Sequence, residues 1–325
     1  MPLALITGAA GVMGSRLVKR LLGSGWQVRA LVLPGDKLRS RIEALGCEIR
    51  EGNVCDPASL TGVCEGVDTV YHLAAVIISH DPSVFGRVNR DGTAHLVLQA
   101  ASAGVRHFIY VSSASVTYPR RTPYAESKLE AEAVVRRAPG LSYTIVRPTL
   151  VYEQGGGQEL FMFLDYLQRF PIVPFIGAGK AVKRPVWSED VADGLHRIAG
   201  NGAALGKIYN LSGAEPISIR ALAELLLLHH GRSRPFVSVP VALCRAVAWA
   251  LGRVMHRPPL TASAIAGIVN DADLDPTEAT RDLGYLPIGV TEGFQRCFPL
   301  PATLPESELA RPLARHRAIF KGDVT

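Results

Sequence analysis

A glycine-rich turn near the N-terminus constrains the fold more than any other feature. Residues 3–7 form a short apolar run, and a turn with glycines at positions 8, 11 and 14 follows it directly. A helical pattern then covers residues 15–22. Glycines between a strand and a helix allow a tight turn, and they let backbone N–H groups approach a pyrophosphate. The turn therefore predicts a dinucleotide site, and its cofactor-binding residues are Gly8, Ala10, Gly11, Val12, Met13 and Gly14.

Apolar strand candidates alternate with helical segments through the first two thirds of the chain. They lie at residues 3–7, 27–33, 47–51, 67–73, 107–113, 143–147 and 207–211. This alternation predicts the α/β class, with a Rossmann doubly wound parallel sheet whose ligand binds at the carboxyl ends of the strands. Gly8, Ala74, Ser113 and Pro148 all fall at that edge of the sheet. Their coincidence favours a functional site over chance.

Tyr124 and Lys128 are four residues apart in a segment rich in helix formers, so they share one helix face. A cation beside a phenol favours the phenolate and moves its pKa toward neutrality. Ser113 ends an apolar strand and can hold the same substrate oxygen. Together the three residues predict proton transfer at a carbinol oxygen. Without its context, the tyrosine–lysine spacing is far more typical of a solvated helix face than of a catalytic pair.

The end of the second strand indicates which nucleotide binds. An acidic residue there would bind the ribose hydroxyls and repel a 2′-phosphate. The strand instead ends at Leu33, and Lys37 and Arg39 follow. These residues favour NADP(H), whereas Asp36 keeps NAD open. A solvated helix face is the alternative interpretation of the two basic residues.

The composition changes after Tyr152. We expect an NAD(P)-binding Rossmann domain at residues 1–152 plus about 187–213. A smaller C-terminal substrate-binding lobe is expected at about 153–186 and 214–298, and a poorly packed tail, with a short helix near 307–318, at 299–325. The apolar segment 239–255 is interrupted by arginines, so it is too short and too charged to span a bilayer. It is predicted to be a buried or pocket-lining helix.

Composition narrows the class of partner. The net charge is +6 and no long basic run carries interleaved aromatics, which argues against a nucleic-acid partner. Five cysteines without metal-ligand spacing indicate reduced thiols, no metal site and a cytoplasmic protein. The N-terminus has no signal-peptide pattern. A small-molecule substrate is expected, and a homodimer is left open by analogy with similar folds.

Several motifs together resemble one family. They are the turn Thr7–Gly14, Tyr71–Ala75, Asn89 with Gly92-Thr93, Tyr110–Ala114, Tyr124 with Lys128, Arg147-Pro148, Val186–Ala192 and Leu283–Pro287. Over residues 3–298 the chain resembles the extended short-chain dehydrogenase/reductases, the NAD-dependent epimerase/dehydratase superfamily. The resemblance implies Tyr124 as acid/base, Lys128 on the nicotinamide ribose and the tyrosine, Ser113 on the substrate oxygen, and Asn89 as support for the lysine. It also implies further cofactor contacts. Asn53 and Val54 would lie near adenine, Leu73, Ala74 and Ala75 near the ribose and phosphates, and Pro148, Thr149 and Leu150 near the nicotinamide amide.

The substrate is less constrained. Only ten residues separate Ser113 from Tyr124, where many sugar-nucleotide epimerases have a long loop, and the arginine-glycine-aspartate pattern those enzymes often carry near residue 257 is missing. These features resemble the branch that handles steroids and ketones. They favour an NAD(P)-dependent oxidoreductase that interconverts a secondary alcohol and a ketone on a partly apolar small molecule. Lys183 and Arg184 lie where an epimerase could place a phosphate ligand, so a nucleotide-sugar epimerase/dehydratase with retained NAD stays open. A non-catalytic NAD(P)-binding protein is the third alternative.

Overall fold

The centre of the protein is a seven-stranded parallel sheet. The structure, a computed structural model, describes residues 1–154, 158–255 and 258–298. The strands of the sheet are β1 (Leu3–Thr7), β2 (Gln27–Val32), β3 (Glu48–Glu51), β4 (Thr69–His72), β5 (His107–Val111), β6 (Ser142–Pro148) and β11 (Lys207–Leu211). Their order is β11-β6-β5-β4-β1-β2-β3, and every pair is parallel. The order reverses between β1 and β4, where doubly wound sheets bind their ligands. The predicted fold class is confirmed.

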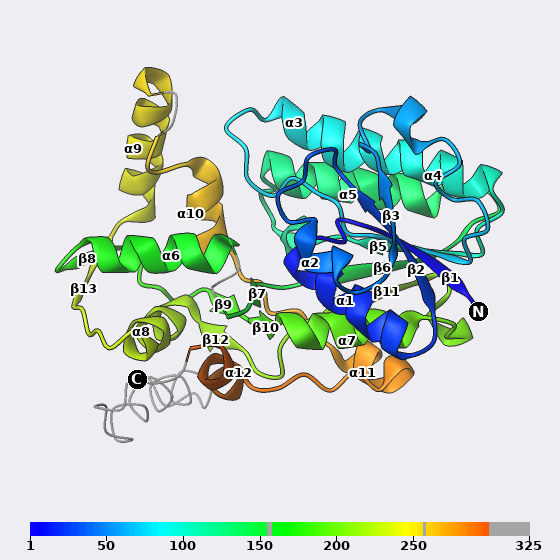
Figure 1. The fold of residues 1–325 in the computed structure, drawn as a ribbon. Helices are drawn as coiled ribbons and strands as arrows, with labels where there is room; N and C mark the ends of the chain where they lie inside the picture. The colour runs from blue at the N-terminus through cyan, green and yellow to red at the C-terminus, as the bar shows by residue number, and fades with distance from the viewer. Residues whose placement is uncertain (155–157, 256–257, 299–325) are drawn as a thin grey trace.

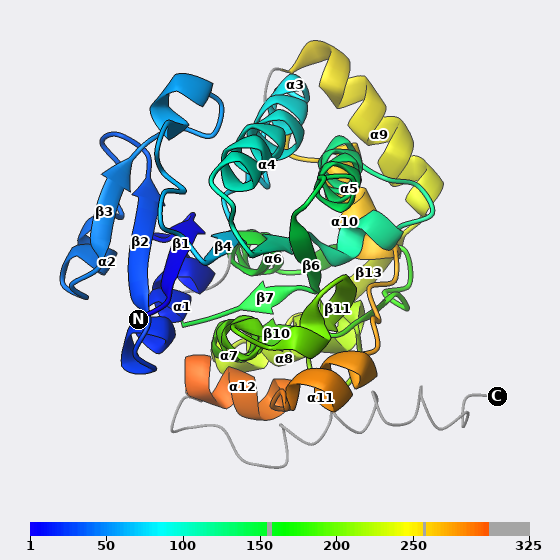
Figure 2. The ribbon, with the colours of Figure 1, turned by 90° about the vertical axis from the view of Figure 1, so that its right-hand side faces the viewer.

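Helices cover both faces of the sheet, because its central strands are apolar on both sides. Ile6 of β1 packs with Leu17 and Leu195 in one buried cluster, whereas the adjacent Leu5 packs with Leu96 in the other. The helices on the first face are α1 (Val12–Gly23), α7 (Ser188–Ile198) and α11 (Thr277–Leu283); those on the second are α4 (Gly92–Ser102) and α5 (Pro123–Arg136). Figures 1 and 2 show these two layers with the sheet between them.

Short elements connect these layers. They are α2 (Ser40–Glu43), α3 (Ser83–Phe85), a π-helical turn (Gly86–Asp91) and three 3-10 turns (Pro57–Leu60, Ala114–Thr117 and Gly202–Ala204). The segment from α3 through the π turn to α4 is helical without a break.

The lobe beyond the sheet has its own core, built mainly around α8 (Ile219–His229), where Leu222, Leu225 and Leu226 are fully buried. Its other helices are α6 (Gln158–Arg169), α9 (Val241–Val254), α10 (Ala262–Val269) and α12 (Val290–Cys297). Its short strands are β8 (Val173–Ile176) with β13 (Phe236–Val239), β9 (Val182–Lys183) with β12 (Ile217–Ser218), and β10 (Val186–Trp187) with β7 (Val151–Tyr152). Figure 1 shows this lobe to the left of the sheet.

Of the two alternatives predicted for residues 239–255, the buried helix is wrong, and the pocket-lining helix stays a prediction. The helix forms at Val241–Val254, but only its Cys244 and Ala248 are buried. They pack with Ile176 and Ile265 in a small cluster. Apolar residues occur around the whole circumference of α9, and this cluster is too small to cover them.

Two further predictions concern membranes and the tail. Within the described ranges, no helix is long and apolar enough to cross a membrane. The predicted tail at 299–325, with its short helix, lies outside the described residues.

Candidate active site

The glycine turn packs tightly against the end of β4. Gly8 has φ of +68°, and a Cβ built there would lie 2.9 Å from the amide nitrogen of Ala74. A Cβ on Gly14 would lie 2.2 Å from the carbonyl oxygen of Gly8. Thr7 accepts a 3.1 Å hydrogen bond from the Ala74 amide and contacts His72 Nδ1 at 2.7 Å. The turn therefore needs glycine at positions 8 and 14, and it holds the two central strand ends together.

The N-terminus of α1 is open to an anion. Gly11 is the N-cap residue and provides no side-chain cap, and the first turn contains no acidic residue. Unpaired backbone N–H groups and the positive end of the helix dipole meet at such a terminus. Val12 and Met13 are its first two helical residues. These residues fit the pyrophosphate of a dinucleotide, because the cradle is closed to side chains and free of negative charge.

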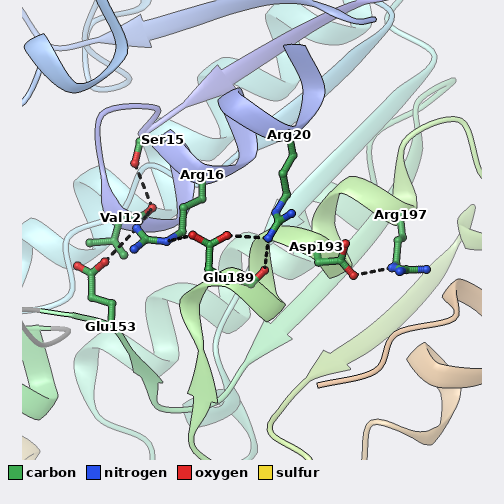
Figure 3. Close-up of polar contacts among 8 residues, drawn as sticks. All are labelled: Val12, Ser15, Arg16, Arg20, Glu153, Glu189, Asp193 and Arg197. Carbon is green, nitrogen blue, oxygen red and sulfur yellow. Dashed lines mark hydrogen bonds and ion pairs between the residues drawn. The ribbon is translucent and has the colours of Figure 1, made fainter. Parts of the chain in front are cut away.

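Ion pairs fasten α1 to the second half of the chain. Arg16 contacts Glu153 at 3.0 Å and Glu189 at 2.8 Å, while Arg20 contacts Glu189 at 2.6 Å. Figure 3 shows how the two arginines reach Glu189 from successive turns of α1. Arg16 Nη1 also donates to the carbonyl of Val12 at 3.2 Å. These contacts fix the position of the helix whose N-terminus forms the cradle.

Tyr124 and Ser113 meet where β5 ends and α5 begins. Thr122 caps α5 by accepting a 3.2 Å hydrogen bond from the amide of Ala125, which places Tyr124 in the first turn. Ser113 lies two residues beyond β5, its Oγ contacts Ser115 Oγ at 3.0 Å, and its hydroxyl is near enough to Tyr124 to lower the pKa of the phenol. The Tyr124 ring packs edge-on against Phe85, with 6.0 Å between centroids. The two hydroxyls are therefore neighbours, and that they share a catalytic site stays a prediction.

The electrostatics of Tyr124 differ from the prediction. Burial raises its pKa above the ordinary value, the charge of Glu159 raises it further, and the hydrogen bond from Ser113 opposes both. Lys128 does not lower this pKa, because its Nζ donates instead to the carbonyl of Val111 at 2.6 Å and lies 4.3 Å from the centroid of the Tyr110 ring. Spacing of four residues gives a shared helix face, but here the lysine extends toward β5.

Lys128 is nearly fully buried, and burial lowers its pKa to about 7. The carboxylate of Glu132, one helical turn further on, acts in the opposite direction. Glu132 is fully buried and forms a two-pronged ion pair with Arg147 of β6, at 2.8 and 2.7 Å. Sequence analysis missed Glu132, although its spacing of four from Lys128 continues the pattern that identified the lysine.

Asn89 is buried in the π turn. Its Oδ1 accepts from the Val76 amide at 2.9 Å, and its Nδ2 donates to the Val76 carbonyl at 3.0 Å and to Ser127 Oγ at 3.1 Å. Ser127 in turn donates to the backbone carbonyl of Tyr124 at 2.8 Å. Asn89 therefore reaches α5 through Ser127, between the tyrosine and the lysine, and ties the segment after β4 to it.

The predicted adenine-side residues are more dispersed. Leu33 and Lys37 are exposed, whereas Arg39 pairs with Glu43 at 2.7 Å and with Glu51. Asn53 Oδ1 accepts from the amide of Cys55 within its own turn, and Val54 is buried against Gly92. Arg39 is thus held in surface ion pairs, which leaves Lys37 as the less constrained of the two cations.

The predicted nicotinamide-side residues follow β4 and β6. Leu73, Ala74 and Ala75 come directly after β4, while Pro148 ends β6 and is followed by Thr149 and Leu150. The hydroxyl of Thr149 donates to the carbonyl of Arg184, so it is already engaged. The two segments lie at the same edge of the sheet as Ser113.

Groups of the lobe face the loop between Ser113 and Tyr124. Lys183 is buried, its Nζ donates to the Asn270 carbonyl, and it lies 5.6 Å from the centroid of the Tyr118 ring. Glu159 interacts electrostatically with Lys183 and with both Tyr118 and Tyr124. A carboxylate and an ammonium group of the lobe therefore lie near the segment that carries Tyr118 and Tyr124. Sequence analysis gave no role to Glu159.

The sheet order, the glycine turn and the tyrosine–lysine helix agree with one family model. The model of the NAD dependent epimerase/dehydratase family matches residues 4–212. The chain belongs to this family. The resemblance to the extended short-chain dehydrogenase/reductases is confirmed, and the protein is a member of the epimerase/dehydratase family whose lobe lies largely beyond the matched residues.

Known members of the family differ in their reactions. A 2-alkyl-3-oxoalkanoate reductase from Stenotrophomonas maltophilia is 26% identical over 90% of this chain and 97% of its own. A 3 beta-hydroxysteroid dehydrogenase/Delta 5→4-isomerase from Mycobacterium tuberculosis is 26% identical over 93% of this chain and 91% of its own. The structure of a dTDP-glucose 4,6-dehydratase double mutant from Streptomyces venezuelae, with NAD bound, gives a TM-score of 0.70 at 25% identity. It covers 92% of this chain and 96% of that one. The family therefore includes both oxidoreductases and a sugar-nucleotide dehydratase.

Proposed function

We propose that this family member is an NAD(P)-dependent oxidoreductase that interconverts a secondary alcohol and a ketone on a partly apolar small molecule. The observation that carries the proposal is the meeting of Ser113 and Tyr124 above a buried Lys128, at the strand edge that also holds the glycine cradle. A nicotinamide cofactor, when bound, would supply or accept the hydride.

The side chains of this protein would then handle the oxygen and its proton. Ser113 would hold the substrate oxygen, and Tyr124 would donate its proton to the oxygen during ketone reduction. The raised pKa of Tyr124 keeps the phenol protonated at neutral pH, which suits a general acid. Lys128 would supply positive charge near the site in its protonated form, which Glu132 favours against the burial that lowers the pKa of the lysine to about 7. Asn89 would act as a positioning residue for α5 through Ser127.

The partners of two cations in the lobe support an apolar substrate over a nucleotide sugar. Lys183 donates to the carbonyl of Asn270, and Arg184 pairs with Asp273 and donates to the carbonyl of Ala214 at 3.1 Å. Both cations are thus committed to internal partners, which argues against a grip on a pyrophosphate. Both full-length relatives named above act, by their names, on an oxoalkanoate or a steroid.

An epimerase or dehydratase with retained NAD is the second candidate, supported by the likeness to the NAD-bound dehydratase. The two candidates differ in cofactor exchange. A protein that is purified with tightly held NAD, and that converts a sugar nucleotide without net change of absorbance at 340 nm, would favour the second candidate. Exchange of free NAD(P)H with net oxidation by a ketone would favour the first.

The experiment that tests the proposed acid is Tyr124→Phe, assayed with a panel of alkyl ketones, oxoalkanoates and oxosteroids. Loss of a general acid should lower turnover by about 10²–10⁴-fold. The dissociation constant of the cofactor should stay nearly unchanged. Tyr143→Phe, in a tyrosine near the opposite end of β6 from the site, is the matched control and should retain turnover. Turnover retained in Tyr124→Phe would refute the assigned role.

A further inference from the structure

The net positive charge of this protein comes almost entirely from one segment. Residues 225–270 contain no aspartate or glutamate, and they include five arginines, at positions 232, 234, 245, 253 and 257. The whole chain has 35 basic and 29 acidic residues, so the remainder has 30 and 29 and is nearly neutral. Almost all of the net charge therefore belongs to the part of the lobe that contains α9 and α10.

The exposed side of α9 carries an apolar stripe. Leu243, Val247 and Val254 are 54%, 40% and 80% exposed, and their spacing of four and seven residues places them on one helix face. Trp249 is 62% exposed and lies on a different side of α9, between Arg245 and Arg253, because successive helical residues are 100° apart. The guanidinium of Arg253 lies 3.6 Å from the centroid of the Trp249 ring. The exposed surface of α9 thus has the apolar stripe along one edge and an aromatic and cationic group along the other.

A third side of α9 is attached to the lobe. Cys244 and Ala248 are buried in the cluster that includes Ile265 of α10. Figures 1 and 2 both show α9 at the outer edge of the molecule. The helix has 14 residues, so its length is about 21 Å at 1.5 Å per residue, which is enough to lie in a bilayer interface but not to span one.

We propose that α9 docks the lobe on the surface of an anionic lipid bilayer, with the apolar stripe at the boundary of the acyl chains and Arg245 and Arg253 among the headgroups. Helices that lie in this interface combine exposed apolar residues with arginine, tryptophan lies at the level of the headgroups, and anionic lipids add electrostatic attraction. Charge complementarity selects this occupant. A second copy of the chain would bring the same arginine-bearing segment, which contains no acidic residue, against itself, and like charges in an interface are repulsive.

The test uses the full chain and two kinds of vesicle, one of phosphatidylcholine alone and one of phosphatidylcholine mixed with phosphatidylglycerol. We expect cosedimentation with the mixed vesicles that is weakened by salt, and binding at least about tenfold weaker to phosphatidylcholine alone. Arg245→Gln with Arg253→Gln should lower the partition coefficient by about tenfold or more. No binding to the mixed vesicles would overturn the proposal.

Matched variants separate docking from misfolding. Leu243→Asp with Val247→Asp should abolish vesicle binding, whereas Leu98→Asp should leave it unchanged, because Leu98 is a 65% exposed leucine of α4 outside the lobe. Equal losses in both variants would overturn the role of α9. Cofactor binding by each variant reports whether the fold is retained, independently of turnover.

A second readout uses Trp249 fluorescence, recorded in a variant with phenylalanine at positions 26 and 187, where the other two tryptophans lie. Brominated lipids in the mixed vesicles should quench it. Absence of quenching in bound protein, or a lipid-free dimer that Leu243→Asp dissociates while no vesicle binding is found, would assign the stripe to another occupant and overturn the proposal.

Discussion

The sheet half of this protein and its lobe differ in which side chains are buried and which are exposed. Around the sheet, the chemically important side chains are enclosed and paired, as Lys128 and Glu132 are between α5 and β6. In the lobe, α9 exposes a tryptophan and several aliphatic side chains, and only two of its residues are buried. The sheet half thus holds its candidate site residues in place through close packing, whereas the lobe leaves apolar surface of α9 exposed.

The largest effect is expected when the sheet half loses one of its buried charges, the carboxylate of Glu132. Glu132→Gln leaves Arg147 without its carboxylate, and loss of one partner of a buried pair should lower the free energy of unfolding by about 3 kcal/mol. It also removes the charge that raises the pKa of Lys128, so that pKa should fall further below about 7. The alkaline limb of the pH profile for ketone reduction should move to lower pH. Denaturant unfolding and the pH–rate profile measure the two effects.

Two comparisons check the assignment for Glu132. Since the folded pKa of Lys128 lies below its ordinary value, the folded state binds fewer protons, and wild-type stability should rise between about pH 7 and 10.5. In Glu132→Gln this rise should begin at lower pH. Arg147→Gln removes the opposite charge and should not move the alkaline limb to lower pH; an equal acid shift in both variants would indicate a purely structural role.

A smaller effect is expected at the glycine turn, and it sharpens the claim that the sheet half depends on close packing. Gly14→Ala forces a Cβ against the Gly8 carbonyl, so it should cost about 1–3 kcal/mol of stability and weaken cofactor binding. Gly23→Ala in the same helix is the matched control. No atom lies within 4 Å of the Cβ it would gain, so it should be neutral or stabilise by about 0.5–1 kcal/mol. Thermal unfolding and cofactor titration distinguish the outcomes, and equal behaviour of the two variants would contradict the close-packing argument.

The smallest effect concerns nucleotide preference, which depends on exposed side chains of the sheet half. If Lys37 contacts a 2′-phosphate, Lys37→Ala should lower the ratio of NADP to NAD affinity by about two- to fivefold, as expected for a solvated ion pair. Arg39→Ala should change the ratio less, because Arg39 is paired with Glu43 and Glu51. Titration of both cofactors measures the ratio. An unchanged ratio in the double variant would remove these side chains from the nucleotide assignment.

Sequence predicted the sheet half well because its signals are local. The glycine turn, the strand alternation and the tyrosine–lysine spacing each act over a few residues, and together they gave the sheet and the meeting of Ser113 with Tyr124. The direction of Lys128 could not be predicted, because it depends on the Val111 carbonyl and the Tyr110 ring of β5. The partner of Arg39 could not be predicted either, since Glu51 comes from β3.

The exposure of α9 could not be predicted from the sequence, for a related reason. Its composition indicates an apolar helix, but burial depends on how much apolar surface remote elements offer. Ile176 of β8 and Ile265 of α10 supply contacts for only one side. Glu159 was missed because its relation to Tyr124 comes from the packing of the lobe against the sheet half and not from spacing along the chain.

The π turn at Gly86–Asp91 has a consequence for how this protein tolerates changes of length. An α-helix turns 100° for each residue, so deletion of one residue from the turn would make the helix regular and rotate Asn89 by about that angle relative to α4. Its amide would then lose both Val76 and Ser127. The spacing between Asn89 and α4 is therefore as restrictive as the identity of the asparagine, and homologous segments of different length are not interchangeable at this point.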